Sequence, residues 1–265
     1  MRRLGVVLTL LLVFVVSSCS GDTARDTPAE NVDTGDPAAF APTEDSIRER
    51  CVSEMPEQVP IRDVLALGDG DATTVPAVVI GPEQTSDTVL VLMHQVGSAL
   101  CGWGRFATAA AEQGVTSVLV DLCGYGDAQC PEGSTAAVSA QLGLGLAAEL
   151  GATRTALVGA SMGGSETVLA MAGGTEADVW VDVSGPSSWA GVQLLTVAPK
   201  IKTPGLVIFA RSDGQPEYAA GKALARSAGA EFLDGGNGHG YELLTDYEGR
   251  LIAGGERLLA FAQGG

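Results

Sequence analysis

The sequence predicts an α/β fold: a mostly parallel central sheet of about eight strands with helices on both faces. Short apolar β-rich runs alternate with helix-compatible segments from residue 62 to 261, and this alternation is typical of parallel sheets covered on both sides. The nearly continuous apolar run 88–93 indicates a strand buried on both faces. A length of 265 residues, 46% of them hydrophobic, suffices for one large domain with a full core.

The elements follow in a regular order. The β-rich runs 62–67 and 74–80 flank a Gly-Asp turn sequence at 68–71 and predict an antiparallel hairpin at the start of the fold. Further strands are expected at 88–93, 117–121, 155–159, 179–183, 205–209 and 230–233. Helices are expected at 103–113, 136–150, 162–172, 216–228 and 247–261. The sequence contains no internal repeat.

The amino terminus has the form of a secretory signal peptide, covering residues 1–18. Basic residues precede the apolar run 4–16, which is too short to span a membrane comfortably, and small residues follow. The ending Val-Ser-Ser-Cys19 resembles a bacterial lipobox, in which the cysteine is lipid-modified and becomes the new first residue. The resemblance implies an exported protein that is lipid-anchored through Cys19 to the outer face of the bacterial cell membrane. An ordinary cleaved signal with a stray cysteine is the alternative.

Residues 19–45 are expected to form the lipidated cysteine and an acidic, disordered tether, and residues 46–265 the folded domain. The tether segment is rich in Asp, Glu, Thr, Pro and Ala and contains little apolar material. The net charge of −17 disfavours nucleic acid as a partner. Anionic lipid headgroups would also repel the chain, so membrane residence is expected to depend on the lipid.

A serine on a sharp strand-to-helix turn is the main candidate for chemistry. Ser161 lies in the pattern Gly159-x-Ser161-x-Gly163, between the expected strand 155–159 and the expected helix 162–172. This pattern is typical of a nucleophile elbow, because side chains beside a strained turn would collide with the strand or the helix. A glycine-rich turn with a surface serine is the alternative, and the motif alone does not separate the two.

Four motifs together resemble an α/β-hydrolase-fold serine hydrolase from about residue 50 to the carboxyl end. They are the strand end and loop 92–98 with a tryptophan behind it, the Asp-x-x-Gly-x-Gly segment 120–126, the elbow 159–163, and Gly-His-Gly at 238–240. The resemblance implies the α/β-hydrolase fold and a catalytic Ser, Asp and His in that chain order.

The serine needs a base within hydrogen-bond reach and an acid that orients the base. The chain has two histidines. His239 lies in a glycine-rich loop after the last predicted strand, where the family carries its base, and a solvent-facing loop histidine is the alternative. His94 lies in the first motif, where the family uses this residue to support the oxyanion loop.

Asp213 is the expected acid, because it follows the strand 205–209 and precedes His239 in the family's order. A turn-forming aspartate before glycine is the alternative. Asp182 and Asp234 are weaker competitors, since Asp182 falls within a predicted strand and Asp234 lies close to the histidine in sequence.

The resemblance also assigns the oxyanion hole. The backbone N–H of Met162 follows the nucleophile, and the second donor is expected from Gln95 or Val96, with Val96 favoured by the family pattern. Two positions depart from the family. Gln95 stands where glycine is commoner, and Cys123 stands where arginine is frequent, although neither position carries a reacting group.

Four cysteines follow Cys19 in the chain. An exported location favours two disulfides, and four cysteines allow three pairings. The pair Cys123 and Cys130, close in sequence across a glycine-containing loop, is favoured, and Cys51 with Cys101 then follows. A reactive cysteine is the alternative, but no motif surrounds these positions.

These observations predict a serine hydrolase that cleaves carboxylic esters of small molecules through an acyl-enzyme on Ser161. The short segment 184–204 predicts a small or absent lid, which favours a carboxylesterase or dienelactone-hydrolase-like enzyme over a lipase. Within it, the apolar residues Leu194, Leu195 and Val197 form either a flap or a packing helix. No metal or organic cofactor is expected. An acyltransferase, a peptidase, and a catalytically silent, surface-anchored binding protein of the same fold are the alternatives.

Overall fold

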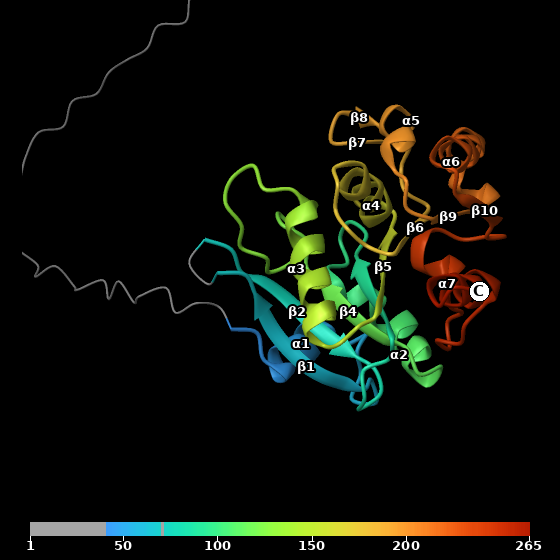
Figure 1. Ribbon diagram of the computed structural model, residues 1–265. Coiled ribbons are helices and arrows are strands. Elements are labelled where there is room, and N and C mark those ends of the chain that lie inside the picture. The colour runs from blue at the N-terminus through green and yellow to red at the C-terminus, as the bar shows by residue number, and fades with distance from the viewer. Residues whose placement is uncertain (1–40, 70–71) are drawn as a thin grey trace, which may run out of the picture. The chain divides into compact units, whose positions relative to one another are not determined.

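The core of the protein is an eight-stranded sheet with the strand order β1-β2-β4-β3-β5-β6-β9-β10. The computed structural model describes residues 41–69 and 72–265, and Figure 1 shows the arrangement of the elements. The strands are β1 (Ile61–Leu67), β2 (Val75–Ile80), β3 (Thr88–Met93), β4 (Thr116–Val120), β5 (Arg154–Ala160), β6 (Val179–Val183), β9 (Gly205–Phe209) and β10 (Glu231–Asp234).

The sheet is antiparallel at one edge and parallel elsewhere. β1 pairs antiparallel with β2, and β2 pairs antiparallel with β4. The other six strands, β4, β3, β5, β6, β9 and β10, are parallel to one another. Every residue of β2, β3, β4, β6 and β9 is buried, as their apolar runs require. The predicted fold class is therefore confirmed.

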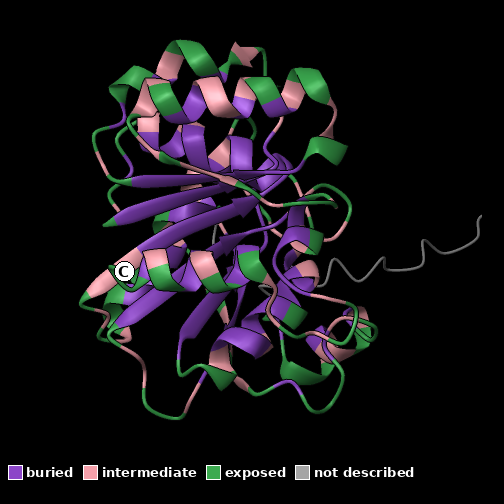
Figure 2. Cartoon of the chain, turned by 90° about the vertical axis from the view of Figure 1, so that its right-hand side faces the viewer, coloured by how far each residue is buried: buried purple, intermediate pink, exposed green. Residues whose placement is uncertain are grey.

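Helices cover both faces of the sheet (Figures 1 and 2). One face packs against α1 (Glu44–Arg50), α2 (Gly104–Glu112) and α7 (Ala253–Ala262). The other face packs against α3 (Ala136–Glu149), α4 (Met162–Ala172) and α6 (Gln215–Ala228). Figure 2 shows the buried strands between two helix layers whose outer faces are exposed. Two hydrophobic cores result, one on each side of the sheet.

One helix prediction was wrong in detail, and one helix was not predicted. The helix expected from residue 247 begins at Ala253, because the segment before it forms a turn in which the Asp246 side chain accepts the backbone N–H groups of Glu248 and Arg250. The helix α1 was not expected. It begins at Glu44, inside the segment 19–45 expected to be a tether, and Thr43 caps it through a capping box.

Both disulfides have the pairing favoured from the sequence, Cys51–Cys101 and Cys123–Cys130. The predicted signal peptide 1–18 and the predicted lipidation site Cys19 lie outside the described residues. Within residues 41–69 and 72–265, no helix is long and apolar enough to cross a membrane.

The segment 184–204 is small, as expected. It contains the two-stranded hairpin β7 (Ser188–Trp189) and β8 (Val192–Gln193), the short helix α5 (Leu194–Val197) and the 3₁₀ turn η2 (Ala198–Lys200). Leu194 is buried in the core that lies on the α4 and α6 side of the sheet. Leu194 and Val197 thus pack against the core, as expected of a packing helix, whereas Leu195 is 50% exposed.

Candidate active site

Ser161 occupies a strained turn between β5 and α4. Its backbone angles are φ +50° and ψ −117°, a region that non-glycine residues rarely adopt. The turn is anchored by a hydrogen bond from the Ser161 N–H to Val183 O, 2.8 Å long. A Cβ on Gly159 would lie 1.9 Å from Gly163 O. The Gly-x-Ser-x-Gly spacing is thus required by the close approach of strand and helix, which is the geometry expected of a nucleophile elbow.

Asp213 and His239 lie together, although 26 residues separate them in sequence. Asp213 ends the 3₁₀ turn η3 (Arg211–Asp213) after β9, and His239 precedes the 3₁₀ turn η4 (Gly240–Leu243) after β10. The His239 Nδ1–H donates to Asp213 Oδ1 over 2.7 Å. The carboxylate is nearly inaccessible, at 3% exposure, whereas half of the imidazole surface is exposed, at 49%. This arrangement leaves Nε2 free to face a reacting group.

The environment favours the charge state that an acid and base pair needs. Burial alone would raise the pKa of Asp213, but hydrogen bonds from His239, from the Ala210 N–H and from the Ser184 hydroxyl outweigh it and hold that pKa below its ordinary value. The hydrogen bond to Asp213 raises the pKa of His239, against the opposing effect of burial, and the charges of Asp213 and Glu242 raise it further. Asp213 is therefore a carboxylate that stabilises the imidazolium form of His239.

The loop that carries His239 packs against the elbow that carries Ser161. A Cβ on Gly240 would lie 3.7 Å from the Cβ of Ala160, so the residues adjacent to His239 and Ser161 nearly touch. Within the described part of the chain, no hydrogen bond joins the Ser161 hydroxyl to His239. Such bonds are often long before substrate binds and tighten in the reacting complex.

The two competing aspartates have other partners. Asp182 is fully buried, and its Oδ1 accepts the Gly185 N–H over 2.8 Å. Burial raises the pKa of Asp182 to about 7, so this group is poorly suited to hold a negative charge. Asp234 accepts the hydroxyl of Tyr218 over 2.7 Å. Neither carboxylate is hydrogen-bonded to His239, whereas Asp213 is.

His94 is a buried, neutral ring next to the loop 95–99, which is the predicted oxyanion loop. Its Nδ1–H donates to Gln95 O over 2.8 Å, and its Nε2 accepts the Leu122 N–H over 3.2 Å. These two partners fix the Nδ1–H tautomer, and burial lowers the pKa of His94. The residue thus connects the loop after β3 to the loop after β4, as a supporting role requires.

Tyr241 holds the oxyanion loop from the opposite side, a contact that the sequence analysis missed. The Gln95 N–H donates to the Tyr241 hydroxyl over 2.9 Å, and the same hydroxyl lies 2.9 Å from Ser98 Oγ. Burial raises the pKa of Tyr241, which keeps the phenol protonated. Because the Gln95 N–H is already bound, it is not free for a substrate oxygen. Val96 is the next residue of the loop, and its side chain is exposed.

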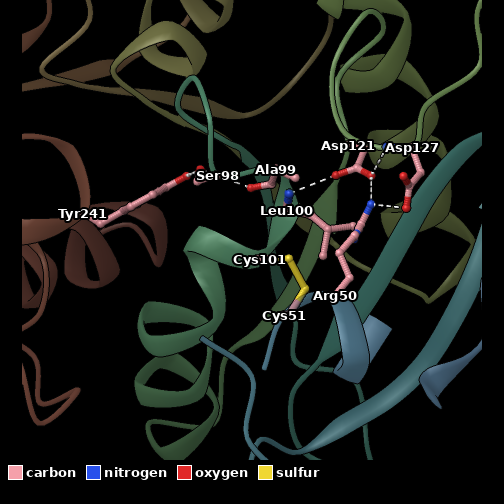
Figure 3. The surroundings of a disulfide bond; sticks show 9 residues. All are labelled: Arg50, Cys51, Ser98, Ala99, Leu100, Cys101, Asp121, Asp127 and Tyr241. Atoms are coloured by element: carbon pink, nitrogen blue, oxygen red, sulfur yellow. Dashed lines mark hydrogen bonds and ion pairs between the residues drawn. A yellow bond between two sulfur atoms is a disulfide. The ribbon is translucent and has the colours of Figure 1, made fainter. Parts of the chain in front are cut away.

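A buried carboxylate anchors the far end of the oxyanion loop (Figure 3). Asp121 accepts the Leu100 N–H over 2.9 Å and pairs with Arg50 over 2.7 Å. Arg50 comes directly before Cys51, which is bonded to Cys101. The loop 95–99 is therefore tied at its far end to α1 by an ion pair and a disulfide that lie side by side.

A cavity of about 530 Å³ borders the candidate site. It lies between the oxyanion loop and the loop that carries His239. Its lining is mixed, with both polar and apolar surface, and includes Glu54, Gln95, Ser98, Gly102, Arg105, Asn237, Gly238, Tyr241, Glu242, Thr245, Asp246, Tyr247 and Ile252. The described residues contain no group of three His, Cys, Asp or Glu side chains placed to hold a metal ion.

Solved structures of esterases and related hydrolases share this fold. A carboxylesterase from Bacillus subtilis matches with a TM-score of 0.60 at 15% identity, over 82% of this chain and 96% of the other. An enol-lactonase from Burkholderia xenovorans matches with a TM-score of 0.53 at 18% identity, over 76% and 97%. An esterase from Pyrococcus furiosus matches with a TM-score of 0.56 at 13% identity, over 67% and 81%. No family model and no curated protein matches the sequence. The chain has the α/β-hydrolase fold.

Proposed function

We propose that this protein is a serine hydrolase that cleaves carboxylic esters, with Ser161 as nucleophile, His239 as base and Asp213 as orienting acid. The observation that carries the proposal is the 2.7 Å hydrogen bond between His239 Nδ1 and Asp213 Oδ1, on a loop that packs against the strained turn of Ser161. The solved esterases and lactonase of the same fold support the reaction class.

The proposed reaction proceeds in two halves. Ser161 Oγ attacks the ester carbonyl carbon while His239 Nε2 takes the hydroxyl proton, and the carbonyl electron pair moves onto oxygen. Collapse of this tetrahedral species breaks the bond to the alcohol, which leaves with the proton from His239. Water then attacks the acyl-enzyme in the same way, releases a carboxylic acid and restores the serine.

The oxyanion is proposed to be held by the backbone N–H groups of Met162 and Val96. Met162 is the first residue of α4, so its N–H lies at the positive end of the helix dipole. The choice of Val96 is supported by the hydrogen bond that already occupies the N–H of Gln95. Loss of one oxyanion donor costs about 10²–10³ in rate.

The substrate is proposed to be a small or accessible ester. The segment 184–204 contributes no large lid, and the bordering cavity is lined by charged groups, among them Glu54, Arg105, Glu242 and Asp246. A long acyl chain needs an apolar cover, and the short segment 184–204 does not supply one. The proposal therefore favours a carboxylesterase or lactonase-like enzyme over a lipase.

Labelling with a fluorophosphonate probe tests the nucleophile. The full-length protein should be labelled, Ser161→Ala should not, and His239→Ala should be labelled much more slowly. Ser165→Ala is a matched control, because this buried serine lies one helical turn further on and donates to Pro186 O; it should be labelled like wild type. Absence of labelling in folded wild-type protein would favour a silent binding protein.

Product analysis separates the remaining alternatives. Hydrolysis of short and long p-nitrophenyl esters should show a preference for short chains. Adding competing alcohols should leave the free acid as the main product, whereas an acyltransferase would form the new ester. Cleavage of peptides but not esters would indicate a peptidase.

We propose separately that the chain is exported and lipid-anchored through Cys19. The lipobox-like sequence that precedes this residue supports the proposal. Cys19→Ala should abolish both the lipid label and the membrane fraction, while esterase activity is retained. Lipid labelling of the Cys19→Ala protein would contradict it.

A further inference from the structure

Ser184 is a buried serine that the ester mechanism described above does not use. It follows the last residue of β6, has 2% of its surface exposed, and adopts φ +58°. Its hydroxyl donates to Asp213 Oδ2 over 2.9 Å. A non-glycine residue in the left-handed region persists only where the surrounding structure holds it there.

Ser184 completes the set of donors around the Asp213 carboxylate. Oδ1 accepts from His239 Nδ1. Oδ2 accepts from the Ser184 hydroxyl and, also over 2.9 Å, from the Ala210 N–H. With both donors on Oδ2, the plane of the carboxylate is fixed and Oδ1 is left to face the imidazole.

The backbone of Ser184 links the acid to the nucleophile. Its N–H donates to Ile208 O on β9, and the preceding residue, Val183, accepts the N–H of Ser161. The end of β6 therefore contacts the nucleophile turn through one residue and the acid through the next. A shift of the end of β6 would change its distance to Ser161 and its distance to Asp213 together.

The other titratable groups near Asp213 do not replace this contact. Asp182 on β6 interacts with Asp213 through charge alone and donates nothing to it. Glu242 on η4 accepts the backbone N–H of His239. Arg211, on the same turn as Asp213, pairs with Asp234. Among the side chains of the described residues, only Ser184 and His239 donate a hydrogen bond to Asp213.

We infer that Ser184 is a positioning residue for the proposed reaction: its hydroxyl orients the Asp213 carboxylate, which in turn holds His239 in the Nδ1–H tautomer with Nε2 directed at the reacting serine. The inference rests on the proposed function. It assigns to Ser184 no contact with substrate.

Two variants separate the hydroxyl from the backbone. Ser184→Ala removes the hydroxyl and keeps the strained φ, whereas Ser184→Gly removes the hydroxyl and relieves the strain. Both should lower kcat about tenfold with KM unchanged, although the glycine variant should melt at the higher temperature. If the loss of kcat instead followed stability, so that the glycine variant kept wild-type kcat, the inference would be overturned.

A double-mutant cycle measures the coupling between Ser184 and Asp213, and a purely structural role for Ser184 would not produce this coupling. In the Asp213→Ala background, Ser184→Ala should cost less than about threefold in kcat, because no carboxylate remains to be oriented. The same tenfold loss in both backgrounds would overturn the inference.

NMR tests the inference without relying on activity. The chain contains two histidines, so ¹⁵N spectra of the imidazole groups are assigned by one His239→Gln variant. Above the pKa of His239, wild-type protein should show the Nδ1–H tautomer, and both Ser184 variants should show a larger Nε2–H fraction. An unchanged tautomer in both would overturn the inference. If folded wild-type protein neither reacts with the probe nor cleaves esters, the proposed function fails, while this spectrum still decides the role of Ser184.

Discussion

A methyl group on Gly163 should push the oxyanion loop away from the amino end of α4. Gly163 is the third residue after β5, and its Cα faces the end of β3. A Cβ at this position would lie 2.1 Å from Met93 O and 2.7 Å from His94 O. Both atoms are backbone carbonyls that lead directly into the loop beginning at Gln95, so no side-chain rotation relieves the collision.

The size of the displacement sets the expected loss of activity. Real Cβ atoms essentially never approach another heavy atom below 3.0 Å, so the helix and the strand must part by about 0.9 Å in Gly163→Ala. A misplacement of about 1 Å at a reacting site can cost about 10² in rate. The two proposed oxyanion donors lie on the two segments that separate. We therefore expect kcat to fall about 100-fold with a smaller change in KM.

The assay is steady-state hydrolysis of a short p-nitrophenyl ester, with circular dichroism to confirm folding. Gly145→Ala is the matched control, because this glycine lies in α3 and a Cβ there meets no atom within 4 Å. The control should keep full activity and gain about 0.5–1 kcal/mol of stability from the higher helix propensity of alanine. Full kcat in a folded Gly163→Ala protein would refute the placement of the oxyanion hole between these segments.

Two further predictions concern pH and the disulfides. Because Asp213 raises the pKa of His239 and the base must be neutral to accept a proton, kcat/KM should fall as the pH drops through a value above about 6.5; a midpoint below this value would contradict the pairing. The loops closed by Cys51–Cys101 and Cys123–Cys130 span 50 and 7 residues, so replacing each pair with alanine should cost about 4 and about 2 kcal/mol respectively. Urea unfolding measures both, and a larger loss from the short loop would show that chain entropy does not dominate.

The glycine spacing around Ser161 allowed the elbow to be predicted from the sequence. Its physical requirement is local: strand and helix approach so closely that Gly159 and Gly163 tolerate no Cβ. The pairing of Asp213 with His239 was predicted from the resemblance to the α/β-hydrolase family, which carries its acid after one strand and its base after the next, and the hydrogen bond between the two side chains agrees with it.

The supporting residues were not predicted, because their roles depend on contacts between distant segments. Tyr241 lies 146 residues from Gln95, whose N–H it accepts. Ser184 lies 29 residues from Asp213, and nothing in its local sequence marks a left-handed backbone. Arg50 belongs to α1, a helix that was not predicted from the sequence. Each of these residues acts through one or two hydrogen bonds or ion pairs, which leave no periodic pattern in the sequence.

At the candidate site, backbone hydrogen bonds like those of the sheet continue past the ends of the strands. The strands β5, β6, β9 and β10 are neighbours in this order, and backbone bonds continue across them past their last paired residues. Ser161 N–H donates to the end of β6, the residue after β6 donates to β9, and Gly235 N–H, just after β10, donates to Phe209 O on β9. Since β6 lies between the strand that carries the nucleophile and the strand that leads to the acid, its carboxyl end sets their separation. The strained residue at that end, Ser184, is for this reason the position where one lost hydroxyl should affect the acid and the base while the core of the sheet stays intact.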